Sequence, residues 1–68
     1  MSTTNAIRSL SDLDQLPVLI PVPRAAEYLG VSRASAYRYA LTGVLPTMRL
    51  GGRVFIHRER LRALLEAA

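Results

Sequence analysis

The sequence predicts a mostly α-helical domain with one small β-hairpin. Two short helical patterns, over residues 22–29 and 33–41, meet at a tight Gly-Val-Ser corner. A Gly-Gly pair then separates two short apolar segments, which is typical of a hairpin, and a last helical pattern covers residues 58–67. These observations predict a single domain over residues 11–67, preceded by a polar, flexible arm over residues 1–10.

The composition favours a polyanionic partner. The 68 residues include nine basic and five acidic side chains, which gives a formal net charge of +4 and a pI near 10.7. A small basic domain of this kind is typical of nucleic-acid binding. Every basic residue is arginine, which we attribute mainly to a GC-rich genome, although the net charge remains. Because the chain has no cysteine and only one histidine, we expect neither a metal nor another cofactor.

Membrane insertion and catalysis are not expected. No apolar run reaches the length of a membrane span and the N-terminus has no secretory pattern, so we expect a cytoplasmic protein. Asp12, Asp14 and Glu27 have no evident metal or nucleophile partner, and His57 has no cysteine or serine dyad. Binding is therefore favoured over enzymatic activity.

The segment before the corner is expected to contain one helical turn and one extended stretch. The turn lies at residues 11–14, with Ser11 or Asp12 as its cap. Residues 18–20 lie between two prolines and are expected to be extended, because residues before proline avoid the α region. This apolar stretch either completes the core or forms a contact between subunits, and the core is slightly favoured.

The first helix of the corner is predicted at residues 22–29. Pro23 suits its first turn, and Gly30 suits a left-handed C-terminal end. Tyr28 is assigned to packing rather than to a phosphate contact, whereas Arg24 faces water and is a candidate phosphate contact. The buried stripe consists of Val22, Ala25, Ala26 and Leu29.

The second helix is predicted at residues 33–41, with Ser32 as its N-cap. Exposure to solvent alone explains the arginines on the outer face of this helix, but it is a poorer explanation for a tyrosine beside small residues on that face. Small residues allow a helix to enter a groove about 12 Å wide. The face towards the first helix consists of Ala36, Tyr39 and Ala40. We expect DNA contacts from Ser32, Arg33, Ala34, Ser35, Tyr37 and Arg38.

The hairpin is predicted over residues 47–56, and its register follows from the apolar pattern. A three-residue loop at 51–53 collects four apolar side chains on one face, whereas a two-residue loop divides them. Since a one-residue slip reverses the faces of a strand, we favour the three-residue loop. Arg53 then lies at the tip, and Arg49 pairs with Phe55. An ordinary solvated hairpin fits as well, but the adjoining basic helix favours a DNA-contacting wing of Arg49, Gly51, Gly52 and Arg53.

The last part of the chain is expected to close the core. Gly43 ends the second helix, after which Val44 and Leu45 are expected to return to the interior. His57 is interpreted as a boundary residue near phosphate, and Arg58 is a weaker phosphate candidate. The final helix, over residues 58–67, has an apolar stripe of Leu61, Leu64 and Leu65. Its basic residues Arg60 and Arg62 are expected to be solvated, and Arg62 is expected to form helix-surface pairs with Glu59 and Glu66.

This order of elements resembles the winged helix-turn-helix domain of MerR-like and excisionase proteins. The resemblance lies in the segments AAEYLGVSRASAYR, GVLPTMRLGGRVFI and RERL. It implies a winged helix that binds DNA, with Arg33, Ala34, Tyr37 and Arg38 on recognition-helix positions and Arg49 and Arg53 on the wing. The family often caps the first helix with Ser or Thr, where this chain has Pro21-Val22-Pro23.

The chain shows no long dimerisation helix or effector domain after the wing, unlike full MerR-type regulators. It is therefore most similar to phage excisionases, and its composition suggests a mycobacteriophage. The resemblance implies a DNA-bending protein that binds double-stranded DNA at a phage attachment site. It also implies self-association in arrays and a phage integrase partner that is directed towards excision. A small transcriptional repressor is the alternative, and a protein-binding adaptor is a further one.

Overall fold

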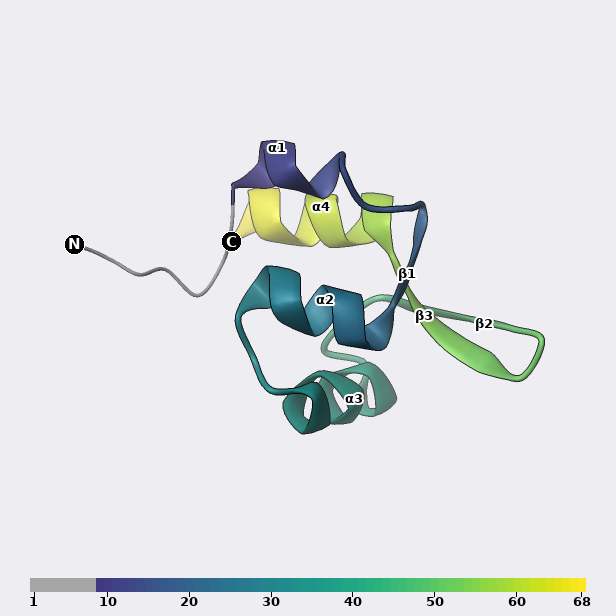
Figure 1. The fold of residues 1–68 in the computed structure, drawn as a ribbon. Coiled ribbons are helices and arrows are strands. Elements are labelled where there is room, and N and C mark those ends of the chain that lie inside the picture. The colour runs from purple at the N-terminus through teal and green to yellow at the C-terminus, as the bar shows by residue number, and fades with distance from the viewer. Residues whose placement is uncertain (1–8) are drawn as a thin grey trace.

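The computed structural model describes residues 9–68, so residues 1–8 of the predicted arm lie outside the described part. It confirms the predicted fold class, and adds a third strand to the hairpin. In chain order, the elements are α1 (Leu10–Leu13), β1 (Leu19–Pro21), α2 (Val22–Leu29), α3 (Arg33–Thr42), β2 (Thr47–Leu50), β3 (Arg53–His57) and α4 (Arg58–Ala67). Figure 1 shows α1 beside α4, with α2 between these helices and α3, while the β2–β3 hairpin extends to one side.

The corner between α2 and α3 forms as the residue types predict. Gly30 has a φ of 74° and its N–H bonds to the Ala26 carbonyl at 2.8 Å, which ends α2 in the left-handed conformation. The hydroxyl of Ser32 accepts a bond from the Ser35 N–H at 3.0 Å, which caps α3. Pro23 stands in the first turn of α2 without disturbing a helical bond. The corner therefore sets the direction of α3 through local backbone chemistry.

The segment before α2 joins the core and the sheet. Ile20 is fully buried in β1, which pairs antiparallel with β3, whereas Val18 is exposed. The core interpretation of this segment is therefore confirmed for Ile20. The predicted cap of α1 is wrong: the helix begins at Leu10, with Ser9 in the N-cap position and no side-chain cap bond.

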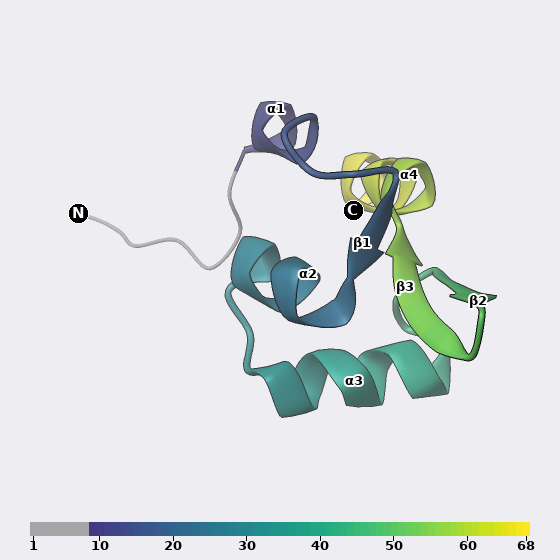
Figure 2. The ribbon, with the colours of Figure 1, turned by 45° about the vertical axis from the view of Figure 1, so that its right-hand side comes forward.

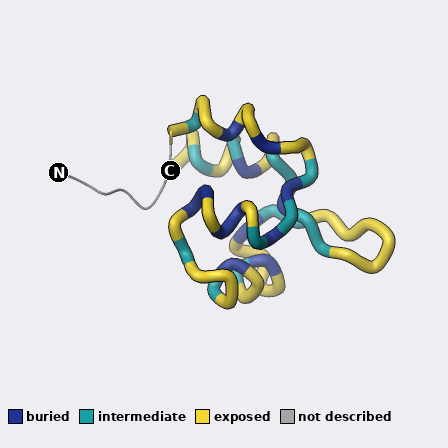
Figure 3. The backbone as a smooth tube through the Cα atoms, viewed as in Figure 1, coloured by how far each residue is buried: buried dark blue, intermediate teal, exposed yellow. Residues whose placement is uncertain are grey.

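The predicted register of the hairpin is also wrong. Leu50 pairs with Arg53, which leaves a two-residue loop of Gly51 and Gly52 with φ of 60° and 79°. Positive φ at both loop residues is what a type I′ hairpin turn requires, and this turn matches the twist of the strands. The prediction assumed that one whole face of the hairpin is buried. Because most of the hairpin lies beyond the core, the turn sets the register instead (Figure 3).

The corrected register exchanges the neighbours of the wing arginines. Arg53 is not at the tip but in β3, and its guanidinium lies over the Phe55 ring at 5.6 Å from the ring centroid. Arg49 pairs with Val54 and not with Phe55, whose cross-strand partner is Met48. The predicted pair of Arg49 and Phe55 is therefore wrong, and the arginine over the Phe55 ring is Arg53 of the same strand.

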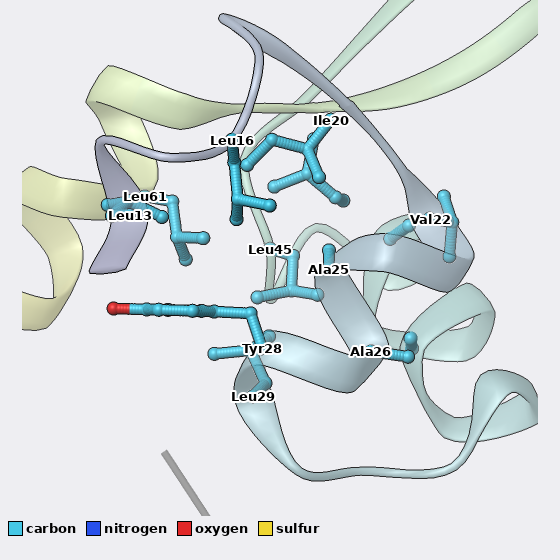
Figure 4. Packing of buried hydrophobic residues seen from close by; sticks show 13 residues of the cluster. Leu13, Leu16, Ile20, Val22, Ala25, Ala26, Tyr28, Leu29, Leu45 and Leu61 are labelled. Atoms are coloured by element: carbon cyan, nitrogen blue, oxygen red, sulfur yellow. The ribbon is translucent and has the colours of Figure 1, made fainter. Parts of the chain in front are cut away.

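One apolar core joins the four helices to the sheet, and Figure 4 shows it from nearby. Tyr28 packs there, and its hydroxyl donates to the Ser9 carbonyl at 3.0 Å, so the packing assignment is confirmed. Burial raises the Tyr28 pKa; Asp12 adds to the rise, and Arg62 opposes it. The buried cluster consists of Leu13, Leu16, Ile20, Val22, Ala25, Ala26, Tyr28, Leu29, Ala36, Ala40, Leu45, Ile56 and Leu61.

Two apolar side chains that were expected to be buried, those of Val44 and Leu64, are exposed at the margin of this core. After Gly43, the side chain of Leu45 is buried in the core, whereas the side chain of its neighbour Val44 is exposed. Leu64 is also exposed, whereas Leu61 is fully buried. Both exposed side chains line a groove between the end of α3 and α4.

Polar contacts fasten α4 to the segment around α1. Arg58 donates through Nη1 to the Leu16 carbonyl at 2.8 Å, and Arg62 bonds to Asp14 and to Glu59. The predicted pair of Arg62 with Glu59 is therefore confirmed. The expectation that Arg62 is otherwise solvated is wrong, because Arg62 also bonds to Asp14, 48 residues away in the sequence. Hydrogen bonds from Arg58 and Arg62 hold the Glu59 pKa below its ordinary value.

Candidate nucleic-acid interface

The outer side of α3 is an uncovered surface. Figure 2 shows α3 along one edge of the molecule, with α2 on its inner side. Ala36 is fully buried and Ala40 nearly so, and their small side chains allow α3 to lie close against α2. The outward side chains of Arg33, Ala34, Tyr37 and Arg38 are exposed to solvent.

Arg38 is oriented by its own helix. Its Nη2 donates to the Ser35 hydroxyl at 3.4 Å, and its guanidinium lies over the Tyr39 ring at 5.5 Å from the ring centroid. The Ser35 hydroxyl also accepts a bond from the Ser32 hydroxyl at 2.9 Å. Ser32 and Ser35 thus take part in capping and in holding Arg38, while the other N–H groups of Arg38 face solvent.

The wing places two more arginines beside this helix. Arg49 and Arg53 are both exposed, on opposite faces of the hairpin, and they lie next to the bare turn of Gly51 and Gly52. A Cβ at either glycine would meet no atom within 4 Å. Backbone conformation, and not crowding, therefore explains glycine at the tip.

A groove connects the helix to the wing. It has a volume of about 380 Å³ and is lined by residues 21–23, by Tyr37 of α3 and by residues 52–55 of the wing. The structure thus brings the predicted contacts Tyr37 and Arg53 to the walls of a single groove. An extended polyanion that crosses this groove meets both elements.

Charge is separated across the molecule, a feature that the sequence interpretation missed. No acidic residue occurs between Glu27 and Glu59, and this stretch holds five of the nine arginines. Acidic side chains pair instead with arginines outside the α3–wing surface, at Arg24, Arg58 and Arg62. Within residues 9–68, no ion pair involves Arg33, Arg38, Arg49 or Arg53. The absence of acidic residues is visible in the printed sequence.

The three further phosphate candidates are placed differently from one another. Arg24 is exposed and only 3.9 Å from Glu27, a separation at which a surface ion pair contributes little. His57 is the N-cap of α4, and its Nδ1 accepts a bond from the Arg60 N–H at 3.3 Å. Arg58 binds the Leu16 carbonyl and Glu59, so its guanidinium is already engaged within the fold.

The exposed side chains of α3 and the wing form a surface suited to binding. Across residues 9–68 no group of three His, Cys, Asp or Glu side chains is arranged to hold a metal ion. The chemistry present on α3 and the wing consists of guanidinium, phenol and hydroxyl groups next to small side chains. Guanidinium groups of this kind bind phosphates and the edges of guanine bases.

A basic helix after a tight turn, flanked by a basic hairpin, defines a DNA-binding protein of the winged helix-turn-helix class. The family model described as Helix-turn-helix domain matches residues 22–68, which is more than half of the chain, and the chain therefore belongs to this family. No curated protein and no solved structure gives a significant match. None of the helices in the described part is long and apolar enough to cross a membrane.

Proposed function

We propose that this protein is a sequence-specific, DNA-bending architectural protein that acts as a phage excisionase. The observation that carries the proposal is the acid-free surface of α3 and the wing, whose four exposed arginines lack ion-pair partners within residues 9–68. A surface with this charge is suited to a polyanion. The excisionase role is supported by the occurrence of this helix-turn-helix family in excisionase-like proteins.

In this proposal α3 enters the major groove of double-stranded DNA. Arg33, Tyr37 and Arg38 reach base edges or phosphates, while Ser32, Ala34 and Ser35 allow close approach. The wing contacts an adjacent minor groove or the backbone through Arg49, Arg53 and the Gly51-Gly52 turn. Phosphate contacts fix position, with Arg24 and His57 as secondary candidates, and base contacts provide sequence preference.

Bending requires more than one copy of so small a domain. Smooth bending of a site by 40–90° costs on the order of 1–6 kcal/mol. Copies on neighbouring sites share this cost if they contact one another. We assign such contacts to the exposed side chains of Val44 and Leu64, which line a shallow groove between the end of α3 and α4. The bent array at the attachment site then favours excision by the phage integrase.

The first experiment is footprinting on the DNA beside the gene, at several protein concentrations. Adjacent protected sites that fill cooperatively are expected, and Val44→Ser should reduce this cooperativity without abolishing occupation of a single site. Complete absence of protection and of a gel shift would overturn DNA binding itself.

A recombination assay separates the excisionase from a transcriptional repressor with the same fold. With the purified integrase encoded in the same genome, the protein is expected to increase excision products and decrease integration products. Unchanged products together with repression of a neighbouring promoter would identify a repressor. In that case the excisionase role would be wrong, while the DNA-binding surface would stand.

A further inference from the structure

The wing carries an apolar side chain where a DNA-binding surface is expected to be polar. Leu50 is 58% exposed and Met48 is 40% exposed, although both belong to a strand. Figure 3 shows that most of the hairpin extends beyond the core as an exposed segment. The apolar surface of Leu50 is therefore available to a partner outside this domain.

The register places Leu50 on the same face of the wing as two residues of the groove that Tyr37 of α3 also lines. Leu50 is paired with Arg53, and Met48 with Phe55, and cross-strand partners project from the same face. Arg53 and Phe55 line the groove whose opposite wall includes Tyr37 of α3. Leu50 thus shares its face with groove residues, and it is the strand residue directly before the turn.

The tip ahead of Leu50 is bare backbone. Gly51 and Gly52 have no side chains, and open space surrounds both positions. A tip without side chains approaches a narrow groove more closely than a substituted one. The minor groove of B-DNA is only about 6 Å wide, so a bare turn at this point permits the leucine behind it to reach the base pairs.

Charge selects the partner of this apolar side chain. Leu50 follows Arg49 in the sequence and pairs with Arg53 across the hairpin. No acidic residue lies between Glu27 and Glu59 in the sequence. A second copy that docked here with its own wing would bring like charges together. A polyanion with an apolar interior, which is the base stack of DNA, satisfies both the arginines and the leucine.

We infer that Leu50 is an apolar wedge that inserts between two base pairs from the minor groove and kinks the duplex there. Flexible pyrimidine–purine steps, such as TA and CA/TG, unstack most easily and are the expected sites. This inference rests on the proposed DNA binding, and it localises the bend to one base step for each bound copy. Leu50 then influences site selection without a hydrogen bond to any base.

The experiment uses a duplex that the protein itself selects from a random library. The adenine of each TA or CA/TG step is replaced in turn by 2-aminopurine, whose fluorescence rises when it is unstacked. Dyes on the two ends of the duplex report bending by energy transfer. The proteins compared are the wild type, Leu50→Ala, Leu50→Phe and the control Val18→Ala, which truncates a similarly exposed side chain on another part of the surface.

The wild type and Val18→Ala are expected to raise the fluorescence at one step and to increase energy transfer. Leu50→Ala should lose most of both signals while it still shifts the duplex in a gel, and Leu50→Phe, which keeps a wedge, should retain them. Circular dichroism checks that each variant is folded.

Three outcomes would overturn the wedge. The first is a Leu50→Ala protein that unstacks and bends the duplex as the wild type does. The second is a wild type that binds without unstacking any step, which leaves the proposed DNA binding intact. The third is loss of cooperative binding with an unchanged bend, which would assign Leu50 to contacts between copies. If no duplex is bound at all, the proposed function fails together with the wedge.

Discussion

Replacing Arg38 by alanine separates a role in DNA recognition from a role in the fold. Among residues 9–68, the side chain of Arg38 makes a 3.4 Å hydrogen bond to Ser35 and a cation–π contact with Tyr39, both at the surface. Loss of these contacts should change the free energy of unfolding by no more than about 0.5 kcal/mol. A bidentate contact to a base is worth about 1–3 kcal/mol, so affinity for the selected duplex should fall roughly 5- to 150-fold.

The matched control is Arg60→Ala. Arg60 is exposed on α4, makes no ion pair within the described residues, and carries the same charge. Both variants lose one positive charge, so any general electrostatic loss is common to them. Gel-shift titrations on a duplex with a single site, at fixed salt, provide the comparison. Equal affinities for the two variants, or an unchanged midpoint for Arg38→Ala, would refute the assignment of α3 as the recognition helix.

The other predictions concern the wing, the pH dependence and the core. Arg53→Ala should reduce the steepness of log affinity against log salt by about 0.9, as for one lost phosphate contact. An unchanged slope together with an unchanged affinity would show that Arg53 does not contact DNA. Hydrogen bonds from Arg58 and Arg62 lower the Glu59 pKa in the folded state. The stabilisation of the fold by these bonds is therefore present above pH 4.5, the ordinary pKa of a glutamate, and is lost as the pH falls through the folded-state pKa. The Tm difference between wild type and Glu59→Gln should therefore shrink in acid; a constant difference from pH 3 to 7 would contradict this. Ile56→Val, at a fully buried site, should cost about 0.5–1.5 kcal/mol and lower Tm by roughly 2–12 °C in thermal melts, and a Tm within error of wild type would contradict close packing there.

The parts of the fold that local chemistry decides could be predicted from the sequence. Gly30 and Gly43 adopt left-handed φ at helix ends, and Ser32 caps α3, because each outcome depends on a few neighbouring residues. The buried side of α2 also follows from helical spacing. The exposed side of α3 is where the sequence places it, although its contacts with DNA remain a prediction.

The parts that depend on how far the core extends could not be predicted. The hairpin register was inferred from burial of one face, but β2 projects past the core and the turn decides. The sequence predicted the local pair of Arg62 with Glu59, but not the bonds of Arg58 to Leu16 and of Arg62 to Asp14, whose partners lie more than 40 residues away in the sequence. Long-range partners of this kind leave no periodic signal in the chain.

The packing of α1 has a consequence for where this module can be cut. The family match begins at residue 22, yet Leu13, Leu16 and Ile20, which belong to the core formed by residues 9–68, come before that point. A chain started at Val22 would also lose β1 and the carbonyl that accepts the Arg58 bond. A fusion protein that carries this DNA-binding domain should therefore include the chain from Ser9 onward, because the segment that the family model matches is shorter than the unit that folds.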